Sequence, residues 1–337
     1  RRVHGETMCS MEWARGEVIG RGSFSTVNIA TTYSFDLIAV KSVGVSDAAR
    51  LRHEKSVLDA IGSHPNIIRC LGADITSENF KQQYNLLLEY AEEGSLADRL
   101  RESGGKITER EVRNFVRQVL SGLAHVHERG FAHLDIKPSN LLLTDSGDVR
   151  IADFGLAERV TPGDRRGNMV GTPMFMAPES MNRNEYGASC DVWAVGCSAL
   201  EMATGRPPWT HGHGDATAVS LMFRIGVGDE VPALPDELSE EGKDFLRKCF
   251  VKDPTKRWTA GMLLNHPFVS KIEDESERFV SVSPRRVFEF PGEESSPESF
   301  IFPDVPVSVP VSKRLRELSG DCFLEWEVDE RWLSVRG

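Results

Sequence analysis

The chain has few cysteines, and no pairing pattern connects them. Its 337 residues include six cysteines, and no two stand in a C-x-x-C arrangement. Disulfide frameworks and zinc sites both depend on cysteines at close, regular spacing. The scattered pattern is typical of reduced thiols, so we expect a protein of the cytoplasm, the nucleus or both. The positions are Cys9, Cys70, Cys190, Cys197, Cys249 and Cys322.

The chain also lacks long apolar runs and an excess of positive charge. No apolar run approaches the ~18–20 residues that span a bilayer, and the polar start Arg1–His4 does not resemble a signal peptide. The formal net charge is −11. Nucleic acids and anionic membranes favour basic partners. We therefore expect neither nucleic acid nor a membrane as the main partner.

The composition is that of a globular protein with a different final segment. Hydrophobic residues make up 40% of the chain and charged residues 27%, which suffices for a sizeable core. Residues 271–337 carry nine Lys and Arg against fifteen Asp and Glu, a net charge of −6. Such an acidic segment cannot bury a core of its own. We expect residues 271–337 to be a mostly disordered tail.

Two short motifs carry the chemistry. The stretch His133–Asn140 reads His-Leu-Asp-Ile-Lys-Pro-Ser-Asn, and Asp153–Gly155 begins thirteen residues after its Asn. Asp and Asn are also common in caps and turns, but hydrophobic strands flank both motifs. Phosphoryl transfer needs a carboxylate for the attacking hydroxyl, a Lys for the phosphoryl charge, and oxygen ligands for Mg²⁺. Asp135, Lys137, and the pair Asn140 and Asp153 supply these parts in that order.

Both motifs, in this order, resemble those of the protein kinase family. The resemblance covers about residues 14–270, and residues 1–13 are expected to form a disordered extension. It implies an α+β, two-lobed fold. A small lobe, about residues 14–91, would hold an antiparallel sheet and one helix, and a larger, mostly helical lobe would span about residues 92–270. One departure stands out, because Leu134 replaces the family's Arg.

The resemblance implies an ATP site between the lobes. The turn Gly20–Val27 is similar to the family's glycine-rich loop, although Ser25 replaces its third Gly and the same turn also fits a plain hairpin. Lys41 matches the family's phosphate-binding lysine, and Glu54 its partner on the following helix. The implied ATP-binding residues are Gly20, Gly22, Ser23, Val27, Ala39, Lys41, Glu89, Ala91 and Leu142.

The larger lobe shows further matches to the family. Thr108–Glu111 forms a capping box before a helix of regular apolar spacing. The resemblance implies that Asp191 braces the backbone of the catalytic loop. It also implies a buried, structural ion pair between Glu179 and Arg257.

Local motifs narrow the subfamily. The strings Gly171–Glu179 and Trp193–Ser198 resemble plant mitogen-activated protein kinase kinase kinases of the short, MEKK-like group. Such kinases phosphorylate Ser or Thr in the activation loop of a mitogen-activated protein kinase kinase. The implied cofactors are ATP and Mg²⁺, and Thr172 is expected on the substrate side of the site.

Leu134 bears on regulation. In kinases with Arg at this position, the guanidinium pairs with a phosphorylated residue of the activation segment. Leu cannot form this pair, and residues 153–179 contain only Thr161 and Thr172 as hydroxyl residues. We hypothesise that activity does not depend on a phosphate–arginine pair.

The tail carries candidate regulatory sequences, each with a plainer interpretation. Ser283–Pro284 and Ser296–Pro297 are either phosphorylation sites or ordinary linker dipeptides. Lys313–Arg316 is either a docking or nuclear-import patch or a solvated basic turn. The apolar and acidic stretch Phe323–Trp326 is a candidate contact for regulators that bind the tail.

The alternative function is a pseudokinase scaffold that binds cascade partners without catalysis. Pseudokinases usually lack a reacting group, whereas Lys41, Asp135, Asn140 and Asp153 are all present. The sequence therefore favours an active kinase.

Overall fold

The computed structural model describes residues 12–22, 25–78, 80–160, 169–209 and 218–270. Contacts divide the chain into two units, Arg1–Glu273 and Asp274–Gly337. The second unit lies outside the described residues, as do Ser23, Thr161 and residues 1–11 of the expected extension. Among the described helices, none is long and apolar enough to cross a membrane.

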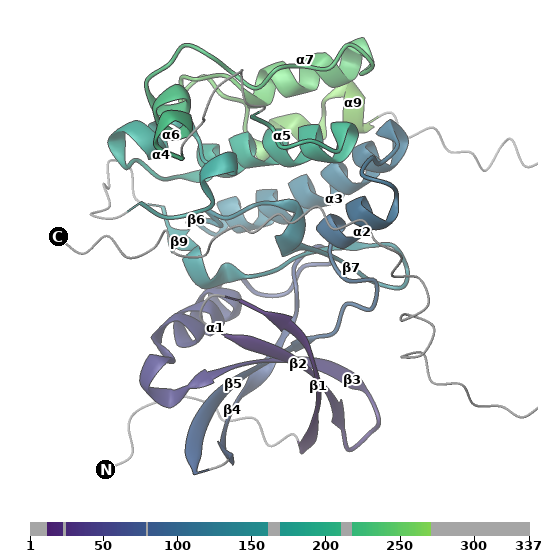
Figure 1. The fold of residues 1–337 in the computed structure, drawn as a ribbon, viewed down its shortest axis with the longest axis vertical. Helices are drawn as coiled ribbons and strands as arrows, with labels where there is room; N and C mark the ends of the chain where they lie inside the picture. The colour runs from purple at the N-terminus through teal and green to yellow at the C-terminus, as the bar shows by residue number, and fades with distance from the viewer. Residues whose placement is uncertain (1–11, 23–24, 79, 161–168, 210–217, 271–337) are drawn as a thin grey trace, which may run out of the picture. The chain divides into compact units, whose positions relative to one another are not determined.

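The first part of the described chain is a five-stranded antiparallel sheet in the order β1-β2-β3-β5-β4 (Figure 1). Alternation along β5 explains why its apolar run is buried throughout. Leu86 and Leu88 face the main core, and Leu87 faces a smaller cluster with Val40 on the opposite side. The strands are β1 Trp13–Arg21, β2 Thr26–Thr32, β3 Leu37–Gly44, β4 Cys70–Glu78 and β5 Lys81–Glu89.

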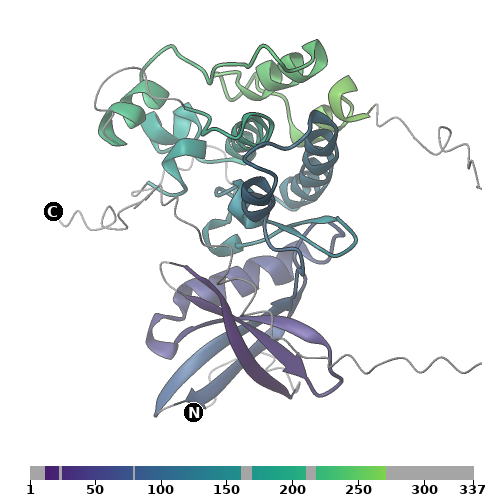
Figure 2. The same cartoon turned by 45° about the vertical axis from the view of Figure 1, so that its right-hand side comes forward.

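Helix α1, Ala49–Ile61, connects β3 to β4 and lies along one face of the sheet (Figure 2). Val57, Leu58 and Ile61 recur at helical spacing and are buried against the sheet. The helix ends at Gly62, whose φ of 72° suits a residue without a Cβ. Glu54 is fully buried on the same helix, which requires a partner for its charge.

The remainder of the described chain is mostly helical (Figure 1). The predicted capping box of α3 is confirmed, since Thr108 and Glu111 each accept a hydrogen bond from the other's backbone. Most residues of α5 are buried, so this helix forms the centre of the lobe. The helices are α2 Leu96–Glu102, α3 Glu109–Glu128, α4 Pro178–Arg183, α5 Ala188–Thr204, α6 Ala218–Gly226, α7 Glu240–Cys249, α8 Ala260–Leu264 and α9 Pro267–Ser270.

Two short strand pairs place the catalytic motifs. β7, Leu141–Leu143, pairs with β8, Val149–Ile151. The backbone N–H of Ala152 donates to the carbonyl of Asn140 over 2.9 Å, so the ends of the two motifs lie side by side. The second pair joins β6, Phe131–Ala132, to β9, Glu158–Arg159. The α+β, two-lobed fold expected from the sequence is confirmed.

Candidate active site

A cleft of about 410 Å³ separates the sheet from the helical lobe. Every described residue that the sequence assigned to ATP binding lines this cleft. These residues are Gly20, Gly22, Val27, Ala39, Lys41, Glu89, Ala91 and Leu142. Glu54, Asn140 and Asp153 line it as well.

Sequence reasoning missed several lining residues. Ile19 precedes the glycine turn and could have been found from that position alone. Ile68 and Ala152 carry no such signal, because they reach the cleft only when β8 meets the segment before β4: the N–H of Ile68 donates to the carbonyl of Ile151 over 2.9 Å. A larger cavity of about 930 Å³ lies between Thr32–Ile38 and the β7–β8 turn. It contains Glu89 but none of the reacting groups, so the chemistry lies in the smaller cleft.

Lys41 is the centre of the charge network in the cleft. Its Nζ donates to Oε2 of Glu54 over 2.6 Å and to Oδ1 of Asp153 over 2.8 Å. Burial alone would lower the pKa of Lys41, but the charges of Glu54 and Asp153 outweigh burial and raise it. Burial raises the pKa of Glu54, and Lys41 opposes that effect. The lysine therefore stays charged, and α1 is tied to the cleft through Glu54.

Asp153 remains a carboxylate at neutral pH. Burial would raise its pKa, but the charge and hydrogen bond of Lys41, with a smaller effect from the charge of Arg50, lower the pKa to about 2. Its side chain is still 37% exposed, and its backbone is left-handed, with φ 64° and ψ 66°. A charged, accessible carboxylate in a strained conformation is typical of a functional position.

Asp135 lies beside the cleft and receives several donors. Its Oδ1 accepts a hydrogen bond from the Thr172 hydroxyl over 2.7 Å. Its Oδ2 lies 3.0 Å from Lys137 Nζ and accepts from Asn140 Nδ2 over 3.0 Å. Lys137 Nζ also donates to the Thr172 hydroxyl over 2.8 Å. The structure thus brings together the predicted catalytic pair and the predicted substrate-side threonine.

Asp191 holds the backbone of the catalytic loop, His133–Asn140, through two hydrogen bonds. Its two carboxylate oxygens accept from the N–H groups of His133, over 2.8 Å, and Leu134, over 2.7 Å. Leu134 has a φ of 67°, which is costly for a bulky residue. The bracing role predicted for Asp191 is confirmed. It keeps Leu134 in a conformation that the chain would otherwise avoid.

His133 joins the two catalytic motifs. Its Nδ1 accepts from the N–H of Asp135 over 3.2 Å, so its Nε2 carries the proton and donates to the carbonyl of Ala152 over 3.0 Å. Its ring also meets Phe154 edge-on, with 4.7 Å between the centroids. The catalytic loop and the Asp153–Gly155 motif are therefore packed as one body.

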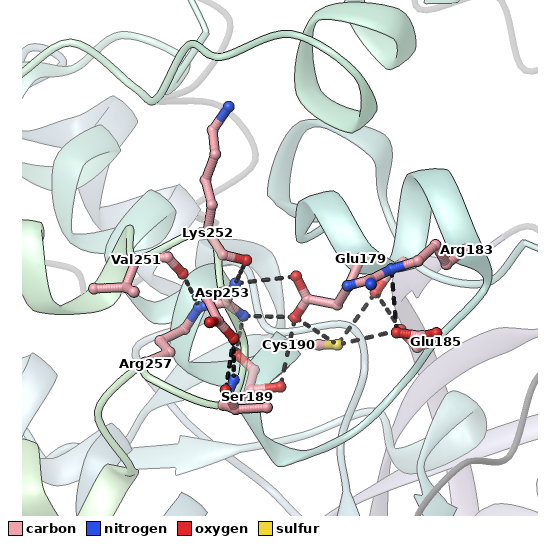
Figure 3. A network of polar contacts seen from close by, with 11 residues as sticks. Glu179, Arg183, Glu185, Ser189, Cys190, Val251, Lys252, Asp253 and Arg257 are labelled. Atoms are coloured by element: carbon pink, nitrogen blue, oxygen red, sulfur yellow. Dashed lines mark hydrogen bonds and ion pairs between the residues drawn. The ribbon is translucent and has the colours of Figure 1, made fainter.

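Figure 3 shows the network at the end of the activation segment. Arg257 donates from both terminal nitrogens to Glu179, over 2.6 and 3.0 Å, and both side chains are almost fully buried. The predicted ion pair is confirmed. Burial and the charge of Glu179 raise the pKa of the Cys190 thiol to about 12. The thiol therefore stays protonated and donates to Oε1 of Glu179 over 3.5 Å.

Leu134 lies against the activation segment through apolar contact. It lines a small cavity together with Val170, Met176 and Tyr186. The hydroxyl of Tyr186 accepts from the N–H of Val170 over 3.0 Å. A methyl group added at Gly171 would lie 2.9 Å from the Leu134 carbonyl oxygen. Close packing thus joins the catalytic loop to this part of the segment.

The cleft and its charge network define a class of protein. A buried Lys–Glu pair, a loop carboxylate beside a lysine and a hydroxyl, and a second carboxylate at the mouth of a cleft between two lobes together form the arrangement of a protein kinase. The fold alone would not show this, because function resides in the site.

Comparison with known proteins also identifies a protein kinase. The family model described as "Protein kinase domain" matches residues 13–269. The chain is 49% identical to mitogen-activated protein kinase kinase kinase 20 of Arabidopsis thaliana over 97% of this chain and 100% of the relative. It is 43% identical to mitogen-activated protein kinase kinase kinase 18 of the same plant over 79% of each chain. It is 42% identical to mitogen-activated protein kinase kinase kinase 17 of this plant over 78% of this chain and 71% of the relative.

The chain therefore belongs to the protein kinase family and, within it, to the mitogen-activated protein kinase kinase kinases. It is a serine/threonine protein kinase. The resemblance inferred from the sequence is confirmed.

Proposed function

We propose that the chain transfers the γ-phosphoryl group of ATP to a Ser or Thr of a mitogen-activated protein kinase kinase. One observation carries the catalytic part: the hydroxyl of Thr172 donates to Asp135 Oδ1 and accepts a hydrogen bond from Lys137 Nζ. A substrate hydroxyl at that place would meet a proton acceptor and a cation at once.

The residues of the cleft fit Mg²⁺-ATP. Asn140 turns its amide nitrogen toward Asp135, to its carbonyl over 2.8 Å and its carboxylate over 3.0 Å. Its amide oxygen and the Asp153 carboxylate then offer the hard oxygen ligands that Mg²⁺ prefers. Among the described residues, no cluster of three His, Cys, Asp or Glu forms a site made by protein alone.

The bound nucleotide and metal would supply the phosphoryl group and neutralise its charge. Lys41, fixed by Glu54, would contact the phosphates. Backbone groups at Glu89 and Ala91 would bind the adenine, between the apolar side chains of Val27 and Leu142. The glycines of the turn would let the backbone approach the phosphates.

In the same proposal Asp135 accepts the proton of the attacking hydroxyl and Lys137 stabilises charge on the transferred group. Thr172 positions the substrate next to both. Each of the three residues thus has one role in the reaction. A general base in such a position contributes roughly 10²–10⁴-fold to the rate.

The choice of substrate is the finer part of the proposal. It is supported by the names of the relatives, which are kinases of this cascade level. We expect the purified chain to phosphorylate one or more members of a panel of kinase-dead mitogen-activated protein kinase kinases on activation-loop Ser or Thr, as mapped by mass spectrometry. Transfer to generic substrates without any transfer to the panel would refute the substrate while leaving the kinase activity in place.

The pseudokinase scaffold that the sequence analysis weighed makes a different prediction. It predicts binding to the same panel with no phosphate transfer to any member. Lys41 and Asp153, and Asn140 and Asp135, are all present and form hydrogen bonds with one another in these two pairs, which supports the active kinase. Location in the cytoplasm or nucleus, and regulators that bind residues 271–337, also belong to this proposal.

A further inference from the structure

Helix α1 contacts the Asp153–Ala157 segment through more than its buried glutamate. Arg50, His53 and Glu54 lie three and four residues apart, so they share one face of the helix. The Nε2 of His53 lies 2.7 Å from the carbonyl oxygen of Ala157. Because a carbonyl can only accept, this nitrogen is the donor. The contact ties α1 to Ala157, the second residue after the Asp153–Gly155 motif.

Arg50 packs directly on the motif. A methyl group added at Gly155 would lie 2.9 Å from Nε of Arg50 and 3.4 Å from its Cγ. The guanidinium stem therefore covers Gly155 with no space between them. The same position would be 3.3 Å from Oδ1 of Asp153, so the arginine, the glycine and the carboxylate occupy one compact group.

The segment needs such support. Asp153 has a left-handed backbone, and a non-glycine residue keeps that conformation only where its surroundings enforce it. In kinases with Arg before the catalytic Asp, a phosphate pair helps to order the neighbouring segment. Leu134 cannot form that pair. The contacts from α1 act directly on residues 153–157 instead.

We propose that Arg50 and His53 are positioning residues, which hold Asp153–Ala157 in the metal-binding conformation. Glu54 contacts Lys41, whereas Arg50 packs on Gly155 and His53 contacts Ala157. The inference rests on the proposed function, since it assumes that Asp153 binds Mg²⁺.

The first test uses the full chain without nucleotide. Amide hydrogen exchange is measured for the 153–157 segment in the unchanged chain and in Arg50→Ala and His53→Ala. The Ala157 N–H, which donates to the Phe154 carbonyl over 3.1 Å, should lose protection in both variants. Lys55→Ala removes a charge from α1 that pairs with Asp59 and should leave protection unchanged. His53→Gln, which keeps an N–H donor, should restore it in part.

The second test separates positioning from packing. Calorimetry measures ADP affinity with and without Mg²⁺ for the unchanged chain and for the variants of the first test. We expect Arg50→Ala to lower the Mg²⁺-dependent gain in affinity by roughly 10-fold, as loss of a supporting contact does at other metal sites, with little change in Mg²⁺-free affinity. Unchanged exchange and an unchanged Mg²⁺ gain, with only a lower unfolding midpoint, would overturn the proposal. No Mg²⁺ gain in the unchanged chain would instead refute the proposed function.

Discussion

At the scale of single residues, Leu134 is the most informative departure from the family pattern. Its side chain contributes apolar contact where an arginine would contribute charge, and its strained backbone is fixed by Asp191. The neighbouring segment is held by the Val170–Tyr186 hydrogen bond and by the tight approach of Gly171. None of these contacts needs a phosphate.

We therefore expect Thr161→Ala to keep the activity of the unchanged chain, because no phosphate–arginine pair is lost. The measurement is phosphate transfer by the two purified proteins, each also assayed after phosphatase treatment. Loss of activity in a variant with an unchanged unfolding midpoint would show that the segment depends on a modified Thr161 after all.

Glu201 gives a prediction about pH. It lies on α5, its Oε2 is buried with no hydrogen-bond partner among the described residues, and burial raises its pKa from 4.5 to about 7. The folded chain thus keeps a proton that the unfolded chain releases near pH 4.5. The stabilising contribution is complete below about pH 4.5 and is lost as the pH rises through about 7.

Glu201→Gln should remove this loss. Urea unfolding at about pH 5 and about pH 8 measures it: the free energy of unfolding should fall more between the two values for the unchanged chain than for the variant. Equal changes in the two proteins would show that Glu201 titrates normally.

At the scale of elements, close packing of α5 on α7 fixes the helical lobe. A methyl group at Gly196 would lie 2.7 Å from Cβ of Cys249 and 2.8 Å from Cε1 of Phe250. Neither neighbour is the free end of a flexible side chain. The two helices approach this closely because a glycine faces a small residue.

Gly196→Ala should accordingly lower the free energy of unfolding by about 1–3 kcal/mol, the usual cost of overpacking. The matched control is Gly261→Ala on α8, where the nearest atom to an added methyl, Thr259 Oγ1, lies 4.0 Å away. That variant should be neutral or more stable by about 0.4–1 kcal/mol. Equal effects in urea titrations would contradict the packing argument.

The connection from α4 to the loop before α8 depends on a buried ion pair. Arg257 is bonded to Glu179 and also donates to the carbonyls of Ser189 and Val251. Arg257→Ala leaves the buried Glu179 carboxylate without its counter-charge and should cost about 3–5 kcal/mol. Glu230→Gln, which breaks the exposed pair with Arg224, should cost less than about 1 kcal/mol. An equal decrease in the free energy of unfolding of the two variants would show that the buried pair stabilises the fold no more than the exposed pair does.

At the scale of the whole molecule, the active site forms where segments far apart in the chain meet. The sequence was sufficient for the motifs, because Asp135, Lys137 and Asn140 stand on one loop and their spacing is itself the signal. It was also sufficient for the partners Glu54, Asp191 and Arg257, which occur in recognisable strings. These predictions needed only local order.

The rest could not be predicted from local order. Arg50 packs on Gly155, and His53 donates a hydrogen bond to the carbonyl of Ala157. Both contacts depend on how α1 is placed against the helical lobe. Ile68 and Ala152 reach the cleft because β8 meets the segment before β4, which local order does not show either. A pattern of apolar spacing tells which face of a helix is buried, but it does not tell what the polar side chains beside that face will touch.

The central claim is that this arrangement performs phosphoryl transfer to Ser and Thr. The most direct measurement is transfer from radiolabelled ATP, with Mg²⁺, to a generic protein substrate, followed by phosphoamino acid analysis, for the full chain and Asp135→Asn. We predict phosphoserine or phosphothreonine from the unchanged chain and a loss of about 10²–10⁴-fold in the variant, at equal unfolding midpoints. Transfer by neither protein, or equal transfer by both, would contradict the claim.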